Sequence, residues 1–155
     1  MEFEIREALP RDLSPALQLD RESFGMDSWT LLDYFGVFSM RSVKKFTAEV
    51  NGQFAGFAAM EYDPHQRAAC LMTLAVSPEY RNRGIGAALL KKCEEAFPGK
   101  DFFLNVDTAN ESAIRLYERS GYRQTGIERS YYMNGHDALI MKKGNRAHKD
   151  PDAAV

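Results

Sequence analysis

The residues best suited to chemistry lie in one basic, glycine-bearing loop. The segment reads Arg81-Asn82-Arg83-Gly84-Ile85-Gly86 and continues with Ala87 into an apolar helical pattern, after a strand pattern that ends at Val76. Backbone N–H groups at the start of a helix bind anions, and glycines let oxygen atoms approach the backbone closely. The segment therefore predicts a site for a phosphorylated ligand, with Arg81 and Arg83 adding charge at its rim.

Three kinds of phosphate loop carry glycines in such a place, and two of them do not fit. A dinucleotide fingerprint needs a third glycine where this chain has Leu89, and it does not follow an antiparallel meander. A Walker A loop ends in Gly-Lys-Ser/Thr, which this segment lacks. A cradle for the pyrophosphate of coenzyme A fits. A glycine-bearing turn that merely begins a helix is the alternative without a ligand.

Two motifs together carry a family resemblance. The loop is similar to the Arg/Gln-x-x-Gly-x-Gly/Ala signature of the GNAT acetyltransferase superfamily. The later segment NESAIRLYERSGY, residues 110–122, resembles that superfamily's Asn-x-x-Ala-x-x-Leu-Tyr-x-x-x-Gly-Phe motif. Two motifs at the expected separation are more specific than either alone, and the resemblance covers Phe3 to about Lys143. It implies acetyl transfer from acetyl-CoA to an amine.

The resemblance also implies roles for individual residues. Tyr117 matches the family tyrosine near the thioester sulfur, where a phenol can protonate the leaving thiolate as a general acid. Asn110 matches a residue that contacts the coenzyme, although it could simply cap a helix. The splayed strand end supplies backbone N–H groups to the oxyanion and the pantetheine arm. The expected coenzyme-binding residues are Leu74, Ala75, Val76, Arg81, Asn82, Arg83, Gly84, Ile85, Gly86, Ala87 and Asn110.

A finer resemblance concerns the acceptor. Residues 129–141, RSYYMNGHDALIM, look like the paired-tyrosine segment of protein N-terminal acetyltransferases, among them the bacterial ribosomal-protein alanine enzymes. In those enzymes the tyrosines lie over the substrate α-amine and its first backbone amide. This implies that Tyr131 and Tyr132 bind the acceptor, whereas aromatic packing at a strand end is the alternative. Glu22 is a further candidate for binding the incoming ammonium.

The general base departs from the family pattern. Where the bacterial enzymes have a glutamate on the fifth strand, this chain has Asn105, which cannot take a proton. Asp107 shares the strand face of Asn105 and could act through water, or could be an ordinary loop acid. His136, on the tyrosine loop, titrates in the useful range but could simply be exposed. A water chain without one strong base also remains open.

Hydrophobic periodicity predicts the elements that must position these residues. We expect an α+β sandwich, a mostly antiparallel mixed sheet of about seven strands with helices on both faces. The break at Gly25–Ser28 makes Ser28 a plausible N-cap for a helix over Trp29–Phe35. Strands are expected at Phe3–Ile5, Phe46–Val50, Phe54–Tyr62, Ala69–Val76, Phe102–Val106, Tyr122–Ile127 and Ala138–Met141, and the other helices at Leu13–Phe24, Gly84–Phe97 and Glu111–Ser120.

Length, composition and charge limit the remaining possibilities. The chain has 155 residues, 45% of them hydrophobic and 27% charged, which fits one domain over residues 1–143 and a polar tail over 144–155. The net charge of −2 gives no support to nucleic-acid binding. No signal peptide, membrane span or metal-binding spacing is recognised, and two cysteines fit a reducing, cytoplasmic compartment. We expect a monomer or homodimer without a metal.

The leading hypothesis is therefore an acetyl-CoA-dependent N-acetyltransferase that acts on a protein or peptide α-amine by direct attack in a ternary complex. An α-amine, with a pKa of about 7.7–8.0, needs less help from a base than a lysine at about 10.4. A small-molecule amine as acceptor is one alternative, favoured by a closed acidic pocket. An open groove between the loops Gly25–Trp29 and Tyr131–Gly135 would favour a peptide. A non-catalytic acyl-CoA sensor is the other alternative, supported by the missing glutamate.

Overall fold

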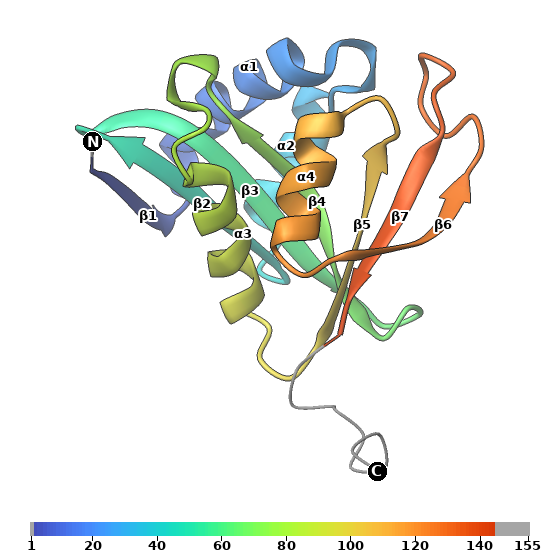
Figure 1. The fold of residues 1–155 in the computed structure, drawn as a ribbon. Helices are drawn as coiled ribbons and strands as arrows, with labels where there is room; N and C mark the ends of the chain where they lie inside the picture. The colour runs from blue at the N-terminus through green and yellow to red at the C-terminus, as the bar shows by residue number, and fades with distance from the viewer. Residues whose placement is uncertain (1, 145–155) are drawn as a thin grey trace.

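One mixed β-sheet organises residues 2–144, the part of the chain that the computed structural model describes (Figure 1). Its order in that part of the chain is β1-β2-β3-β4-β5-β7-β6, with β4 and β5 parallel and every other neighbouring pair antiparallel. The strands are β1 Phe3–Glu7, β2 Val43–Val50, β3 Gln53–Asp63, β4 Ala68–Val76, β5 Asp101–Asp107, β6 Arg123–Glu128 and β7 Ala138–Lys143. The predicted seven-stranded, mostly antiparallel sheet is confirmed.

Helices cover both faces of this sheet, as predicted (Figure 1). α1 (Leu13–Phe24) and α2 (Leu31–Ser39) lie on one face, and α3 (Ile85–Glu95) and α4 (Glu111–Arg119) on the other. Three short 3-10 helices join these elements: η1 Pro10–Asp12, η2 Gly25–Asp27 and η3 Pro78–Tyr80.

Each face has its own apolar core. The larger core packs α3 and α4 on the sheet and includes Leu89, Leu104 and Tyr117. The smaller packs α1 and α2 on the sheet and includes Leu17 and Tyr34. Because successive side chains of a strand point to opposite faces, the core residues Leu104 and Val106 direct Asn105 and Asp107 to the α1–α2 face.

The parallel pair β4–β5 separates along its length. Residues 68–70 pair with residues 101–103, and the pairing goes no further. The rest of β4 keeps its antiparallel partner β3 up to Val76, opposite Gly56. A Cβ on Gly56 would lie 2.9 Å from the Ala75 carbonyl oxygen, so β3 approaches β4 here as closely as a glycine permits. The carboxyl ends of β4 and β5 are thereby spread apart, as expected from the sequence.

The start of α2 differs from the prediction. Thr30, not Ser28, is the N-cap: its side chain accepts a hydrogen bond from the Asp33 N–H (3.2 Å), and Asp33 Oδ2 accepts one from the Thr30 N–H (2.8 Å). Trp29 stays outside the helix because its N–H donates to Asp20 Oδ2, 2.7 Å away. The reciprocal Thr30–Asp33 capping box therefore determines where the helix begins.

Several other boundaries move by a few residues. β2 begins at Val43 rather than Phe46, because pairing with Glu61 of β3 extends beyond the apolar alternation. α3 ends at Glu95 rather than Phe97, and β7 continues to Lys143. The predicted polar tail lies outside the described residues from position 145 onward.

Candidate active site

The spread ends of β4 and β5 leave backbone groups available to a ligand. On one side, Leu74, Ala75 and Val76 pair with β3, while within residues 2–144 their other side has no strand partner. Peptide groups of this kind can bind an extended polar chain or stabilise an oxyanion. The Val76 carbonyl is not free, since it accepts a hydrogen bond of 2.9 Å from Arg81 Nε.

The basic loop leads directly from this edge to the start of α3 (Figure 1). Gly84 is the N-cap, with φ of +85°, a left-handed conformation that favours glycine. Its carbonyl accepts the first helical hydrogen bond, from the Ala88 N–H at 3.0 Å. Helical geometry leaves the first N–H groups of α3 without intrahelical partners, and these are the groups that bind anions.

Gly86 has a different physical reason to be a glycine. A Cβ there would lie 3.2 Å from Leu116 Cδ2 of α4 and within 4 Å of the Leu74 and Val76 side chains. The sequence suggested that Gly86 opens the backbone to phosphate. The structure instead shows a close approach of α3 to α4 and β4, and a Cβ at Gly84 would meet nothing within 4 Å. Of these two glycines, Gly84 is therefore the one that has open space beside it.

The first residues of the cradle differ in burial. Arg81, Asn82 and Arg83 are exposed, and Asn82 also has a positive φ, of 60°. Ile85 is buried in the larger core and anchors the first turn of α3, whereas Ala87 is exposed. The loop is thus anchored by the buried Ile85, while its charged side chains lie at the surface.

α4 presents Asn110 and Tyr117. Asn110 Oδ1 accepts a hydrogen bond from the Ala113 N–H (3.2 Å), so its role as a helix N-cap is confirmed. Tyr117 is buried in the larger core, with its ring 6.0 Å from that of Tyr122. Burial raises the pKa of Tyr117, because an anionic phenolate would lose its hydration there. The phenol therefore keeps its proton throughout the neutral range.

The tyrosine loop lies against the end of β5. Tyr131 and Tyr132 pack edge to face at 4.9 Å, and the Tyr131 hydroxyl lies 3.5 Å from Asn105 Nδ2. The loop closes on itself through two backbone hydrogen bonds, from Tyr132 N to His136 O (3.2 Å) and from Gly135 N to Tyr132 O (2.9 Å). The paired tyrosines therefore lie next to Asn105, the position at which the bacterial enzymes have their glutamate base.

Two further residues of this region also meet. His136 Nδ1 lies 2.9 Å from Asp107 Oδ2 and 3.0 Å from Oδ1, and Asn134 Nδ2 donates to Oδ2 at 3.3 Å. Burial raises the pKa of Asp107, but the hydrogen bonds from the Ala109 N–H, His136 and Asn134 outweigh it and the net pKa is lowered. In the sequence, Asp107 and His136 were separate candidates for the base, and nothing indicated that they would pair.

The sequence also missed Asp20. This carboxylate is only 2% exposed and accepts the hydrogen bond from the Trp29 N–H, and burial raises its pKa although bonds from Trp29, Tyr34 and Thr73 oppose that effect. Asp20 follows Ala16 by four residues on the apolar face of α1, and an acid at such a position was the available signal. It fixes the segment between α1 and α2.

The comparisons with known proteins now decide the family. Residues 6–122 match the model of the acetyltransferase (GNAT) family. An uncharacterized N-acetyltransferase of Methanocaldococcus jannaschii is 32% identical over 95% of each chain. This chain belongs to the GNAT acetyltransferase family. It is therefore an N-acetyltransferase with acetyl-CoA as its cosubstrate.

Other relatives of this GNAT chain have names that state their acceptor substrate. The [ribosomal protein bS18]-alanine N-acetyltransferase of Salmonella typhimurium is 31% identical, over 84% of this chain and 89% of its own. The crystal structure of the ribosomal-protein-S18-alanine N-acetyltransferase from Escherichia coli superimposes with a TM-score of 0.78 and 28% identity, covering 92% of this chain and 93% of that chain. The resemblance to this enzyme group is confirmed.

Glu22 is not brought into the same cluster by any hydrogen bond among the described residues. It is exposed on α1, and its Oε1 accepts a bond of 3.1 Å from Gln18 Nε2. Its role toward an ammonium stays a prediction.

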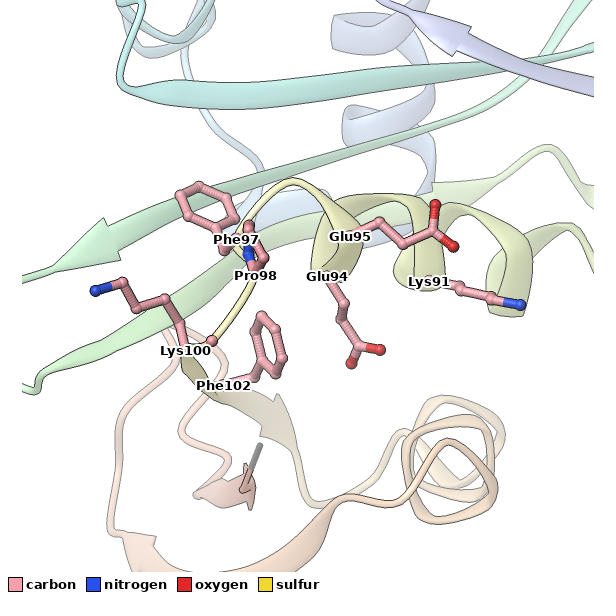
Figure 2. Close-up of a pocket in the computed structure, with 8 residues that line it drawn as sticks. Lys91, Glu94, Glu95, Phe97, Pro98, Lys100 and Phe102 are labelled. Carbon is pink, nitrogen blue, oxygen red and sulfur yellow. The ribbon is translucent and has the colours of Figure 1, made fainter. Parts of the chain in front are cut away.

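A pocket of this acetyltransferase lies away from the site. Figure 2 shows it at the C-terminal end of α3, the opposite end of that helix from the glycine loop. Its lining residues are Lys91, Glu94, Glu95, Phe97, Pro98, Gly99, Lys100 and Phe102. None of them belongs to the glycine loop, to Tyr117 or to the tyrosine loop, so this pocket lies outside the acetyl-CoA site that the sequence predicts.

Residues 2–144 contain neither a cluster of metal-binding side chains nor a helix that could span a membrane. No three His, Cys, Asp or Glu side chains in this range gather closely enough to hold a metal ion. The helices within it are all too short or too polar to cross a membrane.

Proposed function

We propose that this acetyltransferase transfers the acetyl group of acetyl-CoA to the α-amine of a peptide or protein N-terminus, by direct attack in a ternary complex. The observation that carries the proposal is the position of the paired tyrosines. Tyr131 and Tyr132 stand at the end of β5, with the Tyr131 hydroxyl beside Asn105, close to where β4 and β5 spread apart. Phenol groups there can bind the first backbone amide of an acceptor.

The activities of the relatives support the same acceptor class. Two of the matched proteins are alanine N-acetyltransferases of the ribosomal protein S18. The chemistry agrees, because an α-amine with a pKa of about 7.7–8.0 is partly neutral near pH 7. A site whose base position is Asn105 suits such an amine better than a lysine side chain.

In the proposed reaction, the coenzyme lies between β4 and β5. The first N–H groups of α3 and the rim arginines Arg81 and Arg83 bind its pyrophosphate. Backbone N–H groups of Leu74–Val76 bind the pantetheine arm and the developing oxyanion. The amine nitrogen attacks the thioester carbon, the C–S bond breaks, and Tyr117 donates its proton to the leaving thiolate.

The relation between the two loops refines the acceptor question. We expected that an open groove between residues 25–29 and 131–135 would favour a peptide. The structure joins these loops through a hydrogen bond from the Met133 N–H to Asp27 Oδ1, 2.7 Å long. The loops are therefore in contact at this point instead of bordering an open groove, so this feature does not favour a peptide over a small amine.

Turnover on a defined panel tests the proposal. Thiol release from acetyl-CoA is measured with short peptides that differ at the first residue, with N-terminally blocked lysine peptides and with free small amines. Mass spectrometry locates the added acetyl group. Acetylation confined to peptide α-amines is the expected result. Turnover only with small amines overturns the proposed acceptor, and acetylation of blocked lysine peptides alone overturns it equally.

A further inference from the structure

Asp107 at the end of β5 and His136 in the tyrosine loop form a pair of side chains that has no role in the reaction proposed above. His136 and Asp107, 29 residues apart, form a hydrogen-bond contact of 2.9 Å between Nδ1 and Oδ2. Asp107 is held from two further directions, by the Ala109 N–H at 2.8 Å and by Asn134 Nδ2 at 3.3 Å. The carboxylate is therefore fixed, and it fixes the imidazole in turn.

This contact determines which nitrogen of His136 can take a proton. An ionised carboxylate is only an acceptor, so the Nδ1 that lies within 3.0 Å of both Asp107 oxygens must carry the hydrogen. In the neutral ring the lone pair is then on Nε2. The His136 side chain is 48% exposed, so a proton taken up by Nε2 can pass on to water.

The position of the pair relates it to the acceptor. Asp107 and Asn105 share one face of β5, and Asn105 Nδ2 lies 3.5 Å from the Tyr131 hydroxyl. His136 belongs to the same closed turn as Tyr132, whose N–H donates to the His136 carbonyl at 3.2 Å. The imidazole therefore lies in the loop that also carries both tyrosines, and it contacts Asp107, two residues along β5 from Asn105.

We propose that His136, oriented by Asp107, is the base that accepts the proton of the acceptor's ammonium group. His136 is thus a catalytic residue of the reaction, and Asp107 is its positioning residue. The inference rests on the proposed function, because it takes the acceptor to lie at the tyrosine loop.

The protons balance in this scheme. The ammonium gives one proton to His136 Nε2, which releases it to water, and the neutral nitrogen then attacks the thioester carbon. The tetrahedral intermediate loses a second proton from nitrogen, while the departing sulfur gains one from Tyr117. The second proton returns Tyr117 to its phenol form through water. The products are the acetylated amine, the free thiol of coenzyme A and one proton in solution.

The other charged groups around the loop do not compete for this role. Asp27 of η2 accepts a hydrogen bond from the Met133 N–H, and Asp137 accepts one from the Ser130 N–H, each through Oδ1. The phenol pKa of Tyr132 is raised, by burial first and then by Tyr131, Asp107 and Asp27, so it stays neutral. These carboxylates also favour an arriving cation at the loop.

A pH profile of kcat/KM for a peptide acceptor tests the proposal with His136→Gln. At pH 7 we expect a loss of at least about tenfold, since general-base catalysis contributes about 10²–10⁴-fold and an α-amine needs only part of it. The loss should shrink to about twofold at pH 9.5, where the amine is already neutral. The matched control is His65→Gln, an exposed histidine of the β3–β4 turn, which should leave the profile unchanged. A loss of equal size at both pH values overturns the proposal.

Two further variants keep a structural role distinct from a catalytic one. Asp107→Asn should lower kcat/KM at pH 7, and adding it to His136→Gln should cost no more than His136→Gln alone, because both act through one imidazole. In the His136→Gln background, Asn105→Glu should raise kcat/KM at pH 7 at least about fivefold, since a carboxylate at position 105 faces the same acceptor. Additive losses with no restoration overturn the proposal.

The failure of the proposed function reads differently. If the unaltered enzyme acetylates no peptide on the panel, the acceptor is wrong. If it acetylates peptides and His136→Gln has an unchanged kcat/KM at pH 7, only the base is wrong.

Discussion

Asp27 and Met133, which are 106 residues apart in the chain, are joined by a hydrogen bond of 2.7 Å from the Met133 N–H to Asp27 Oδ1. Asp27 belongs to η2, between α1 and α2, and Met133 belongs to the tyrosine loop. The buried Asp20 holds the same inter-helix segment by accepting a hydrogen bond from the Trp29 N–H. A buried carboxylate and a surface carboxylate thus hold the two loops that we propose face the acceptor.

Removing that link should weaken acceptor binding. For Asp27→Ala we expect KM for a peptide to rise about fivefold with kcat changed less than twofold, because a fivefold change corresponds to about 1 kcal/mol, the typical net contribution of one hydrogen bond. The Met133 amide should also exchange with deuterium faster. The control is Asp63→Ala, which removes a carboxylate–backbone bond to the His65 N–H at the opposite end of the sheet (Figure 1). An equal rise in KM with Asp63→Ala would contradict the prediction.

Loss of the Tyr117 hydroxyl should slow the chemical step. Burial raises the pKa of Tyr117, so the phenol is protonated and able to donate at every pH from 6 to 9. Tyr117→Phe should therefore lower kcat about 10²-fold across that range while KM for acetyl-CoA changes less than twofold. Steady-state kinetics of thiol release measures both constants.

Tyr122→Phe is the matched control for this variant. Tyr122 is also buried, packs against Tyr117 and donates a hydrogen bond of 2.8 Å to Glu94 Oε2. Its replacement should lower the free energy of unfolding by about 1–2 kcal/mol and leave kcat unchanged. A similar fall in kcat for both variants would show that packing, not proton donation, is the cause.

The two glycines of the cradle should respond differently to alanine. Gly84→Ala places a side chain in a left-handed conformation with φ of +85°, which costs about 1–2 kcal/mol wherever its neighbours lie. Gly86→Ala is opposed by Leu116 at 3.2 Å and favoured by the helix propensity of alanine. In a Leu116→Ala background, Gly86→Ala should become stabilising by about 0.5–1 kcal/mol. Urea unfolding of the four variants tests this, and equal effects in both backgrounds would contradict it.

The lowered pKa of Asp107 predicts a pH-dependent contribution to stability. A carboxyl whose pKa is lower in the folded state than the ordinary 3.8 stabilises the fold above that value and loses the effect as pH falls through its folded pKa. Asp107→Asn should therefore be less stable than the unaltered protein at pH 7. The difference should diminish only below about pH 3.8. A difference that is unchanged or larger at pH 3 would contradict the prediction, and urea unfolding at both pH values measures it.

Local patterns in the sequence were sufficient for most of the architecture. The alternation of apolar residues predicted the strands, among them Phe46–Val50 and Phe54–Tyr62, which the structure joins as the antiparallel pair β2–β3. Asn110 was recognised as a helix cap from its type and position alone. Such features depend on residues close together in the chain, and the errors in the helices and strands lay at boundaries such as the start of α2, where the Thr30–Asp33 capping box was not recognised.

The family was also determined by the sequence, because the glycine loop and the 110–122 motif are contiguous segments with their own spacing. Contacts between distant segments were decided only by the tertiary structure. The Gly86–Leu116 approach depends on how α3 packs against α4, and the Asp107–His136 pair depends on β7 returning beside β5. A side chain has no local signature for a partner that the fold brings to it, and for that reason His136 was one of several candidate bases in the sequence and only the structure revealed its contact with Asp107.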